Sequence, residues 1–509
     1  MIKQNMLANL IGKVYSAGIA FIVLPIYLQY LGAESYGLVG VFTTIQAFAL
    51  LLDSGITPMV TRDIARMKLQ SGSLNHLQNL LRTTEVLFIF AGVFAFVVIF
   101  FLSDFLSSNW LNIHTLSLET VTQTIILIGV IIGFRFNIGL YGGTIMALEK
   151  QVSYNIALSM IATIKSLGAV YLLMYMSSDI VIFFKYQIVI SVIEFVVYRY
   201  MVWKYLPKSQ EKPRFTFDVY KGNLHFLGGY STSMLFIFIL LQSGNIVLSK
   251  ILSLSQFGYY SFSMSIVSIL QMAGGPLFQA ISPRLMSIYA NDKQNLEIFY
   301  HKACQAISFL LIPAGLMLAI YSYEIIFLWT KNSDTSHNIY MIVSLLSIGT
   351  LLNLLATMPG QLQIADGRTK LMVYINASSL LFVVPMYILF GKMYGGIGIA
   401  IVWVVLNISY LLVGTFLVHP QLLNENKTKW IWRDIIKPFL FVVFFLILSK
   451  YIYIILDFHL ILTKILYLNV VLIISYILII YILDTLRTEV IKIINATLQK
   501  GKYAKTNNE

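Results

Sequence analysis

Runs of apolar residues long enough to cross a membrane recur along the whole chain, with polar residues gathered between them. The windows 86–103, 251–283 and 465–483 contain no Asp, Glu, Lys or Arg. A bilayer core of about 30 Å requires about 20 mostly apolar residues per helix. We predict an all-α integral membrane protein with fourteen spans, at residues 5–30, 36–60, 83–103, 120–147, 154–176, 180–202, 222–249, 257–283, 301–323, 339–365, 371–391, 396–418, 434–456 and 461–484.

The basic residues give these spans a direction, because Lys and Arg are retained preferentially in cytoplasmic loops. With the N-terminus inside, 26 of the 35 Lys and Arg residues fall in cytoplasmic segments and 5 in external segments, and the other 4 lie within spans. We therefore predict a multi-pass protein of the cytoplasmic (inner) membrane with both termini in the cytoplasm.

Composition supports a membrane protein and excludes several other classes. The chain is 58% hydrophobic and 11% charged, whereas about a quarter of the residues in a soluble domain are charged. The net charge of +13 reflects the cytoplasmic loops, so it does not indicate a nucleic-acid partner. Cys304 is the single cysteine, which excludes disulfides and cysteine-rich metal sites. No small-residue cleavage site follows the first apolar run, so we interpret residues 5–30 as a retained helix.

The longest internal polar segment divides the predicted spans into two sets of six. We predict an N-terminal lobe at residues 1–203, a cytoplasmic linker at 204–221, a C-terminal lobe at 222–420, helices 13 and 14 at 421–484 and a cytoplasmic tail at 485–509. Since six is even, both lobes start on the same side, and a repeat between them must be parallel. A weak echo supports this repeat: Tyr36-Gly37 begins the second span, and Phe257-Gly258 begins the eighth.

Ionisable residues lie deep inside the first six predicted spans, although a charge at mid-membrane costs about 2.5–3.5 kcal/mol on the lenient insertion scale. The deep charges are Lys13, Asp53, Arg135, Lys165 and Glu194. They must face one another or a polar cavity. Structural ion pairs such as Lys165–Glu194 or Lys13–Asp53 are one reading. Since three cations face two anions, one positive charge remains, as expected of a cavity for an anion.

The chain has no pattern that predicts catalysis, a cofactor or a bound metal. All seven histidines lie in predicted loops or near span ends, and none has a ligand partner at i+4. A Walker-type phosphate loop is absent from the sequence, and the short external loops contain no nucleophile–base pair. We therefore expect a transporter that is not an enzyme.

Three short motifs near the N-terminus resemble the signature of Wzx-type polysaccharide biosynthesis flippases. These proteins transport O-antigen or capsule repeat units and belong to the multidrug/oligosaccharidyl-lipid/polysaccharide exporter superfamily. The motifs are Leu31-Gly32-Ala33-Glu34-Ser35-Tyr36-Gly37, Leu52-Asp53-Ser54-Gly55-Ile56 and Thr61-Arg62-Asp63-Ile64-Ala65. After the tenth span, Ala365-Asp366-Gly367-Arg368 resembles a recurring turn of the same family.

The resemblance implies two six-helix lobes around a cationic cavity, through which a polyprenyl-diphosphate-linked oligosaccharide passes to the outer leaflet by alternating access. The diphosphate and sugars would occupy the cavity, while the polyprenyl tail stays among membrane lipids. Candidate substrate-binding residues are Lys13, Arg62, Arg135, Lys165 and Arg284. Arg62 and Arg284 would lie at the cytoplasmic mouth, where positive-inside anchoring explains them equally well. Asp53 and Glu194 are candidates for binding a coupling proton or sodium ion.

Three other functions compete with this interpretation. A multidrug exporter of the same superfamily favours an acidic site for cationic drugs, whereas the deep charges here are mostly basic. A flippase for lipid II or a teichoic-acid-type lipid-linked precursor would use similar chemistry. A membrane polysaccharide polymerase would need a large external loop with arginines, but the longest external segments, 104–119 and 324–338, contain Lys331 as their only basic residue.

Overall fold

The computed structural model describes residues 2–53, 55–67, 74–209, 211–220, 224–367, 369–423, 429–484 and 487–488. Throughout these residues the chain is helical, apart from short connections and one isolated β-bridge between Asn112 and Ser253. The all-α prediction is confirmed.

The described residues contain eleven helical segments that are long and apolar enough to cross a membrane. Two of these segments contain a break at a glycine with positive φ: Gly32 (φ 79°) in α1 (Ile2–Asp53) and Gly395 (φ 58°) in α12 (Thr369–Val413). Glycine adopts this conformation at no steric cost. Each of the two segments therefore provides two spans, and α7 (Leu224–Ile251) provides one more. The predicted number of fourteen is confirmed.

One predicted span is interrupted in the structure. Residues 36–60 were expected to form a continuous helix, but α1 ends at Asp53 and α2 (Ile56–Met67) starts as a separate helix. The Asp53 carboxylate accepts hydrogen bonds from the Thr57 hydroxyl (2.6 Å) and the Thr57 backbone N–H (3.3 Å). Asp53 therefore satisfies an N–H group that the start of α2 would otherwise leave unpaired.

By the density of contacts, the chain divides into two compact units. Unit 1 comprises residues 1–262 and 376–396, and unit 2 comprises residues 263–375 and 397–509. The predicted lobes with a linker at 204–221 stay a prediction. The first unit contains α1, α2 and α7, the start of α8 (Leu254–Asn291), part of α12, and the elements α3 (Leu74–Phe105), η1 (Leu106–Trp110), α4 (Leu118–Ala147), α5 (Gln151–Tyr175), α6 (Ile180–Tyr205) and η2 (Phe217–Tyr220).

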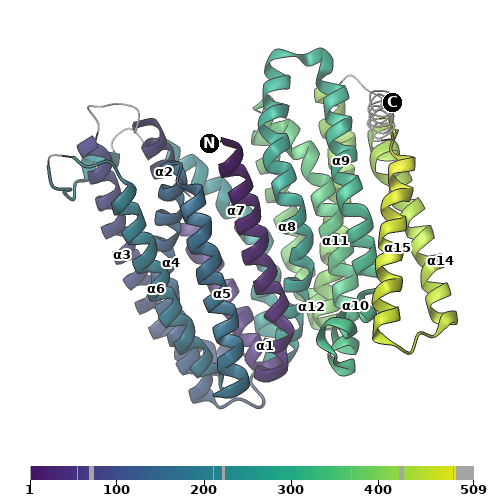
Figure 1. The fold of residues 1–509 in the computed structure, drawn as a ribbon, viewed down its shortest axis with the longest axis horizontal. Coiled ribbons are helices and arrows are strands. Elements are labelled where there is room, and N and C mark those ends of the chain that lie inside the picture. The colour runs from purple at the N-terminus through teal and green to yellow at the C-terminus, as the bar shows by residue number, and fades with distance from the viewer. Residues whose placement is uncertain are drawn as a thin grey trace, which may run out of the picture. The chain divides into compact units, whose positions relative to one another are not determined.

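In unit 1, α4 packs against both α3 and α6. The helix α5 lies against the N-terminal arm of α1 (Figure 1). Glycines permit the closest approaches. A methyl group added at Gly92 of α3 would collide with the backbone of Gly133 on α4. The two glycines of the sequence echo also meet, since a methyl group at Gly258 would lie 2.9 Å from the Gly37 backbone nitrogen. These glycines are therefore points of helix packing.

The segment after α6 is fastened to α3. The Gln78 amide donates to the Pro207 carbonyl (2.6 Å), the Asn79 side chain accepts from the Arg214 N–H (2.6 Å), and the hydroxyls of Thr84 and Tyr220 are 2.8 Å apart. Most of the predicted linker therefore packs on the helices that precede it.

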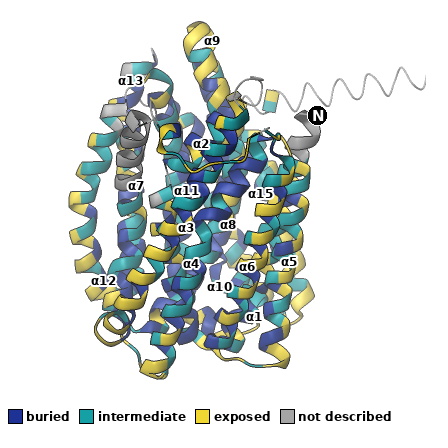
Figure 2. Ribbon diagram, turned by 90° about the vertical axis from the view of Figure 1, so that its left-hand side faces the viewer, coloured by how far each residue is buried: buried dark blue, intermediate teal, exposed yellow. Residues whose placement is uncertain are grey.

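Unit 2 is built around α9 and α11. It contains the rest of α8 and α12, together with α9 (Lys293–Ile320), α10 (Ser322–Thr330), α11 (Ser333–Asp366), η3 (Gly414–Val418), α13 (His419–Leu422), η4 (Ile431–Ile436), α14 (Lys437–Leu456) and α15 (Ile461–Ile482). Exposed apolar residues cover much of α14 and α15, and in Figure 2 exposed residues also run along α5 and α6. Such surfaces suit contact with lipid.

The two C-terminal spans are anchored to α9 by one buried acid. Asp434 of η4 is fully buried and accepts hydrogen bonds from Gln305 (2.8 Å) and from His301, while its carbonyl accepts from the Ser308 hydroxyl (2.6 Å). Arg433 adds an ion pair with the same carboxylate at 3.2 Å. Burial of a carboxylate is tolerated only with such partners.

Candidate functional site

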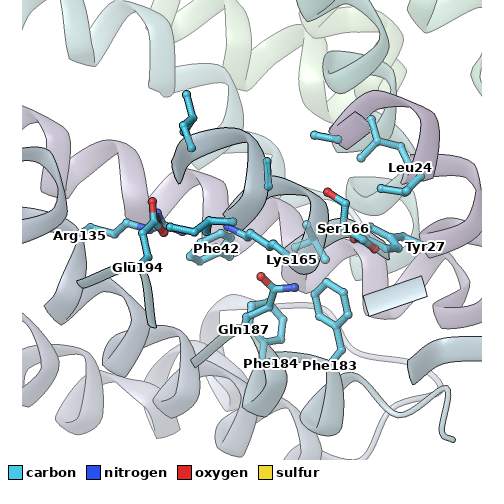
Figure 3. A pocket seen from close by; sticks show the side chains of 16 residues that line it. Leu24, Tyr27, Phe42, Arg135, Lys165, Ser166, Phe183, Phe184, Gln187 and Glu194 are labelled. Carbon is cyan, nitrogen blue, oxygen red and sulfur yellow. Dashed lines mark hydrogen bonds and ion pairs between the residues drawn. The ribbon is translucent and has the colours of Figure 1, made fainter. Parts of the chain in front are cut away.

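A cavity of about 320 Å³ inside unit 1 brings together charges from three different helices. Arg135 comes from α4, Lys165 from α5, and Gln187 and Glu194 from α6. The remaining lining is mainly apolar and aromatic and is contributed by both arms of α1 and by α5 and α6. In Figure 3, Arg135 and Glu194 lie at one end of the cavity and Tyr27 and Ser166 at the other.

Arg135 and Glu194 form the ion pair of this cavity. The Arg135 Nη1 lies 3.4 Å from the Glu194 Oε2, and the two side chains are only 14% and 10% exposed. At this distance the contact is a long hydrogen bond. The Arg135 Nε is buried without a hydrogen-bond partner among the described residues. The guanidinium therefore retains donor capacity that Glu194 does not use.

Lys165 adds a second positive charge beside this pair. Its side chain extends across the cavity towards Glu194 (Figure 3), and it experiences the charges of both Arg135 and Glu194. Among the described residues no acid lies within ion-pair distance of its amine. Two cations thus face one carboxylate, so the cavity carries a net positive charge. In a low-dielectric interior such a surplus favours an anionic ligand.

Polar and aromatic groups line the end of the cavity away from Arg135. The Tyr27 hydroxyl donates to the Ser166 carbonyl (3.2 Å), and the Tyr27 and Phe183 rings meet edge to face at 5.3 Å. The Gln187 side chain lies between these groups and Glu194 (Figure 3). Rings and amides of this kind offer stacking surfaces and hydrogen bonds to a sugar.

The glycines below Arg135 have a role that the sequence did not reveal. On the Arg135 face of α4, the small residues Gly139 and Gly142 predict open space for a ligand, and this prediction is wrong. A methyl group at Gly139 would lie 3.2 Å from the Asp53 Oδ2, and one at Gly142 would lie 3.0 Å from the Tyr154 hydroxyl. The glycines let the end of α1 and the helix α5 approach α4. The open space lies on the side of Arg135 that faces α1, α5 and α6.

The structure brings together three of the seven predicted site residues: Arg135, Lys165 and Glu194. Neither predicted ion pair forms among the described residues. Lys13 is exposed near the start of α1 while Asp53 is its last residue, and Glu194 pairs with Arg135 in place of Lys165.

The two arginines expected at the cytoplasmic mouth lie outside this cavity. The Arg62 guanidinium is 2.8 Å from the carboxylate of its neighbour Asp63. In unit 2, Arg284 is exposed, with its guanidinium 5.5 Å from the centre of the Phe299 ring.

Unit 1 contains a second buried charge cluster, which the pattern of the sequence did not predict. Glu85 of α3 is fully buried and accepts hydrogen bonds from Arg199 (2.5 Å), Tyr141 (2.5 Å) and Arg82 (2.7 Å). The i,i+3 spacing of Arg82 and Glu85 was the one local signal for it. The contacts from α4 and α6 arise only from tertiary packing, and they bind three helices together at one end.

The polysaccharide biosynthesis protein family model matches residues 2–289, which is more than half of the chain and includes the whole cavity. The chain belongs to this family. A putative O-antigen transporter from Shigella flexneri is 23% identical over 405 residues, which cover 79% of this chain and 93% of the relative. The lipopolysaccharide biosynthesis protein WzxC from Escherichia coli (strain K12) is 20% identical over 428 residues, covering 83% of this chain and 81% of the relative.

A solved structure of similar fold is the lipid II flippase MurJ in an inward closed conformation. It has a TM-score of 0.69 and 16% sequence identity, and the match covers 94% of this chain and 99% of that one. At this identity the likeness concerns the fold alone.

Proposed function

We propose that this protein is a flippase that moves polyprenyl-diphosphate-linked oligosaccharide repeat units across the inner membrane for assembly of a surface polysaccharide such as O-antigen or capsule. The observation that carries the proposal is the cavity in which Arg135 and Lys165 face Glu194 as the one acid among the described lining residues. Family membership and the names of the two curated relatives support the same substrate class.

The diphosphate is the part of this substrate that matches the charges of the cavity. Arginine stays charged when desolvated, and its planar fork can donate to two phosphate oxygens at once. Lys165 would supply a second positive charge from the opposite helix. A volume of about 320 Å³ suits a diphosphate with a small adjoining group, so the rest of the glycan would extend beyond the cavity. We propose that Lys13, Arg62 and Arg284 act as further contacts along the route.

Glu194 would compete with the diphosphate for Arg135. When Glu194 is ionised it holds the guanidinium, and when it binds a proton or sodium ion the guanidinium is released to the substrate. This exchange would couple substrate binding to the binding of a cation. Ionisable groups within the membrane serve as ion and proton sites in other transporters. Asp53 accepts a hydrogen bond from Thr57 at the start of α2 and lies beside Gly139 of α4. We propose Asp53 as a second residue that binds the coupling ion.

The competing functions differ in the charge or the glycan that they require. A multidrug exporter for cations would need a net negative cavity, whereas this one is net positive. A lipid II or teichoic-acid-type flippase would bind the same diphosphate and differ only in the attached sugars. A polysaccharide polymerase is the alternative that fits least well. It would need basic residues in a large external loop, whereas the charged cavity lies among the membrane spans.

Translocation in vesicles tests the proposal directly. The purified protein would be reconstituted in liposomes that carry a fluorescent polyprenyl-diphosphate oligosaccharide, and an impermeant glycosidase would report which leaflet holds it. We expect faster exchange between leaflets than in protein-free liposomes. A second set of liposomes that carries lipid II in place of the oligosaccharide lipid tests whether the protein is a lipid II flippase. Exchange at the protein-free rate for the oligosaccharide lipid would contradict the proposed function, and faster exchange of lipid II alone would favour the alternative.

A further inference from the structure

A second cavity, of about 630 Å³, lies at the C-terminal end of α6 and shares no residue with the first. Arg199, Lys204 and Lys208 line it together with Tyr200 and Trp203. These residues face away from the ion pair, since Glu194 is buried whereas Tyr200 is 65% exposed. The distribution of Lys and Arg along the chain predicts that this end of the helix lies at the cytoplasmic surface of the membrane.

The charge around this cavity is strongly positive. Among the residues that the structure describes, Glu85 is the one acid that pairs with Arg199. The Glu85 carboxylate also pairs with Arg82, so it is shared between two guanidinium groups. Neither Lys204 nor Lys208 has an acid within ion-pair distance among the described residues. The Lys204 amine instead lies 5.7 Å from the centre of the Tyr200 ring. The nearby Glu211 accepts from Asn75 on α3. The two lysine amines are therefore available to an external anion, and the Arg199 guanidinium, which is 46% exposed, adds positive charge beside them.

An exposed apolar stripe on α6 leads directly to these cations. Its members are Val189 (55% exposed), Ile193 (41%), Val196 (56%) and Tyr200 (65%), at successive spacings of four, three and four residues. This spacing keeps them on one face, and at 1.5 Å per residue they span about 17 Å. Val196 and Tyr200 also line the cavity itself. The apolar stripe and the basic end therefore form one continuous surface.

We propose that this surface binds an anionic glycerophospholipid of the inner leaflet. The phosphate would lie among Arg199, Lys204 and Lys208, and an acyl chain would lie along the stripe from Val196 to Val189. Trp203 lies between the apolar stripe and the basic end of α6. The amphipathic ring of tryptophan favours the headgroup layer of a membrane. The stripe decides in favour of a lipid over a free phosphate, because a soluble anion gains nothing from it. This inference does not depend on the transported substrate.

Native mass spectrometry of the delipidated full-length protein tests the site, with dioleoyl phosphatidylglycerol added at increasing concentration. We expect the Lys204→Ala/Lys208→Ala variant to bind it at least about tenfold more weakly than the wild type, since each basic residue near anionic lipid contributes to binding. The matched control is Lys293→Ala/Lys302→Ala, which removes two exposed cations from α9 and should bind like the wild type.

Three further arms decide the nature of the ligand. Dioleoyl phosphatidylcholine should bind weakly to every variant, inorganic pyrophosphate should not displace phosphatidylglycerol, and the short-chain dihexanoyl form should bind far more weakly than the dioleoyl form. Equal binding by the wild type and the α6 variant would overturn the proposal. Displacement by pyrophosphate would show a soluble phosphate site, and displacement by polyprenyl diphosphate alone would show a substrate site. Either result would refute the phospholipid, whatever the liposome transport assay gives.

Discussion

Arg135 on α4 and Glu194 on α6 face each other across 3.4 Å in a cavity that also contains Lys165. The distance is long for a charge-assisted hydrogen bond, which is normally about 2.7–2.9 Å. The arginine is thus held near its acid without being fully engaged by it. A geometry of this kind is compatible with the proposed exchange of Arg135 between Glu194 and the substrate.

We predict that Arg135→Ala reduces translocation of the oligosaccharide lipid by at least about tenfold, because a hydrogen bond to a charged group contributes about 1.5–3 kcal/mol. Arg135→Lys should retain partial activity, since it keeps the charge and loses the planar fork. The liposome assay measures both, with Lys293→Ala as an exposed control that should transport normally.

A purely structural ion pair would behave differently. Arg135→Ala would then lower the amount of folded protein by leaving Glu194 buried and unpaired. The double variant Arg135→Ala/Glu194→Gln removes both charges and should then restore the abundance. Recovery of transport in that double variant would contradict a role for Arg135 in substrate binding.

The second prediction concerns ion coupling. Glu194→Gln and Asp53→Asn each keep the shape of the side chain and remove its ability to bind a cation. We expect at least one of them to abolish the response of transport to an imposed proton or sodium gradient while downhill exchange continues. The measurement compares initial rates with and without the gradient. An unchanged response in both variants would assign these acids a structural role only.

A third prediction concerns topology and follows from the distribution of basic residues. With Cys304 replaced by Ala, single cysteines at the exposed positions Lys212 and Asn291 should be shielded from an impermeant thiol reagent in spheroplasts. Cysteines at Asp334 and His459, also exposed, should react. Reaction at Lys212 before permeabilisation would mean that an odd number of spans precedes it.

The fourth prediction is that Asp434→Ala strongly destabilises the protein. The change removes the acceptor for His301, Gln305 and Arg433, and breaking a buried, paired charge costs about 3–5 kcal/mol. Thermal unfolding in detergent should show a marked fall in Tm. Asp484→Asn is the control, since the Asp484–Arg487 pair is about half exposed and such pairs contribute about 0–1 kcal/mol. Equal Tm values for the two variants would argue against the anchoring role of Asp434.

A fifth prediction tests the glycine contact between α3 and α4. Gly92→Ala should destabilise the protein by about 1–3 kcal/mol, the usual cost of overpacking, because the added methyl group meets the Gly133 backbone. Gly18→Ala should be nearly neutral, since nothing lies within 4 Å of the added group. Unfolding in detergent compares the two, and a neutral Gly92→Ala would mean that the helices can separate without cost.

The number of spans and the positions of the deep charges along the chain could be predicted from the sequence alone. The thickness of the bilayer sets the length of each apolar run. A charge in lipid is costly, so Arg135, Lys165 and Glu194 can be recognised as unusual without knowing how the helices pack. These are properties of single segments, so they can be read locally. The break after Asp53 was missed because the apolar pattern continues across it.

Only the tertiary structure decided which charges meet. Helical spacing shows which residues share a face of one helix, but it does not show which helix that face contacts. Arg135 and Glu194 are 59 residues apart in the chain, and their pairing depends on α4 packing against α6. Other faces of α4 make equally close contacts with other helices, since Gly133 meets Gly92 of α3 and Gly139 meets Asp53 at the end of α1. The same packing left Lys13 and Asp53 apart and buried Glu85 among residues of three helices, because the energy of each contact depends on partners that no single segment contains.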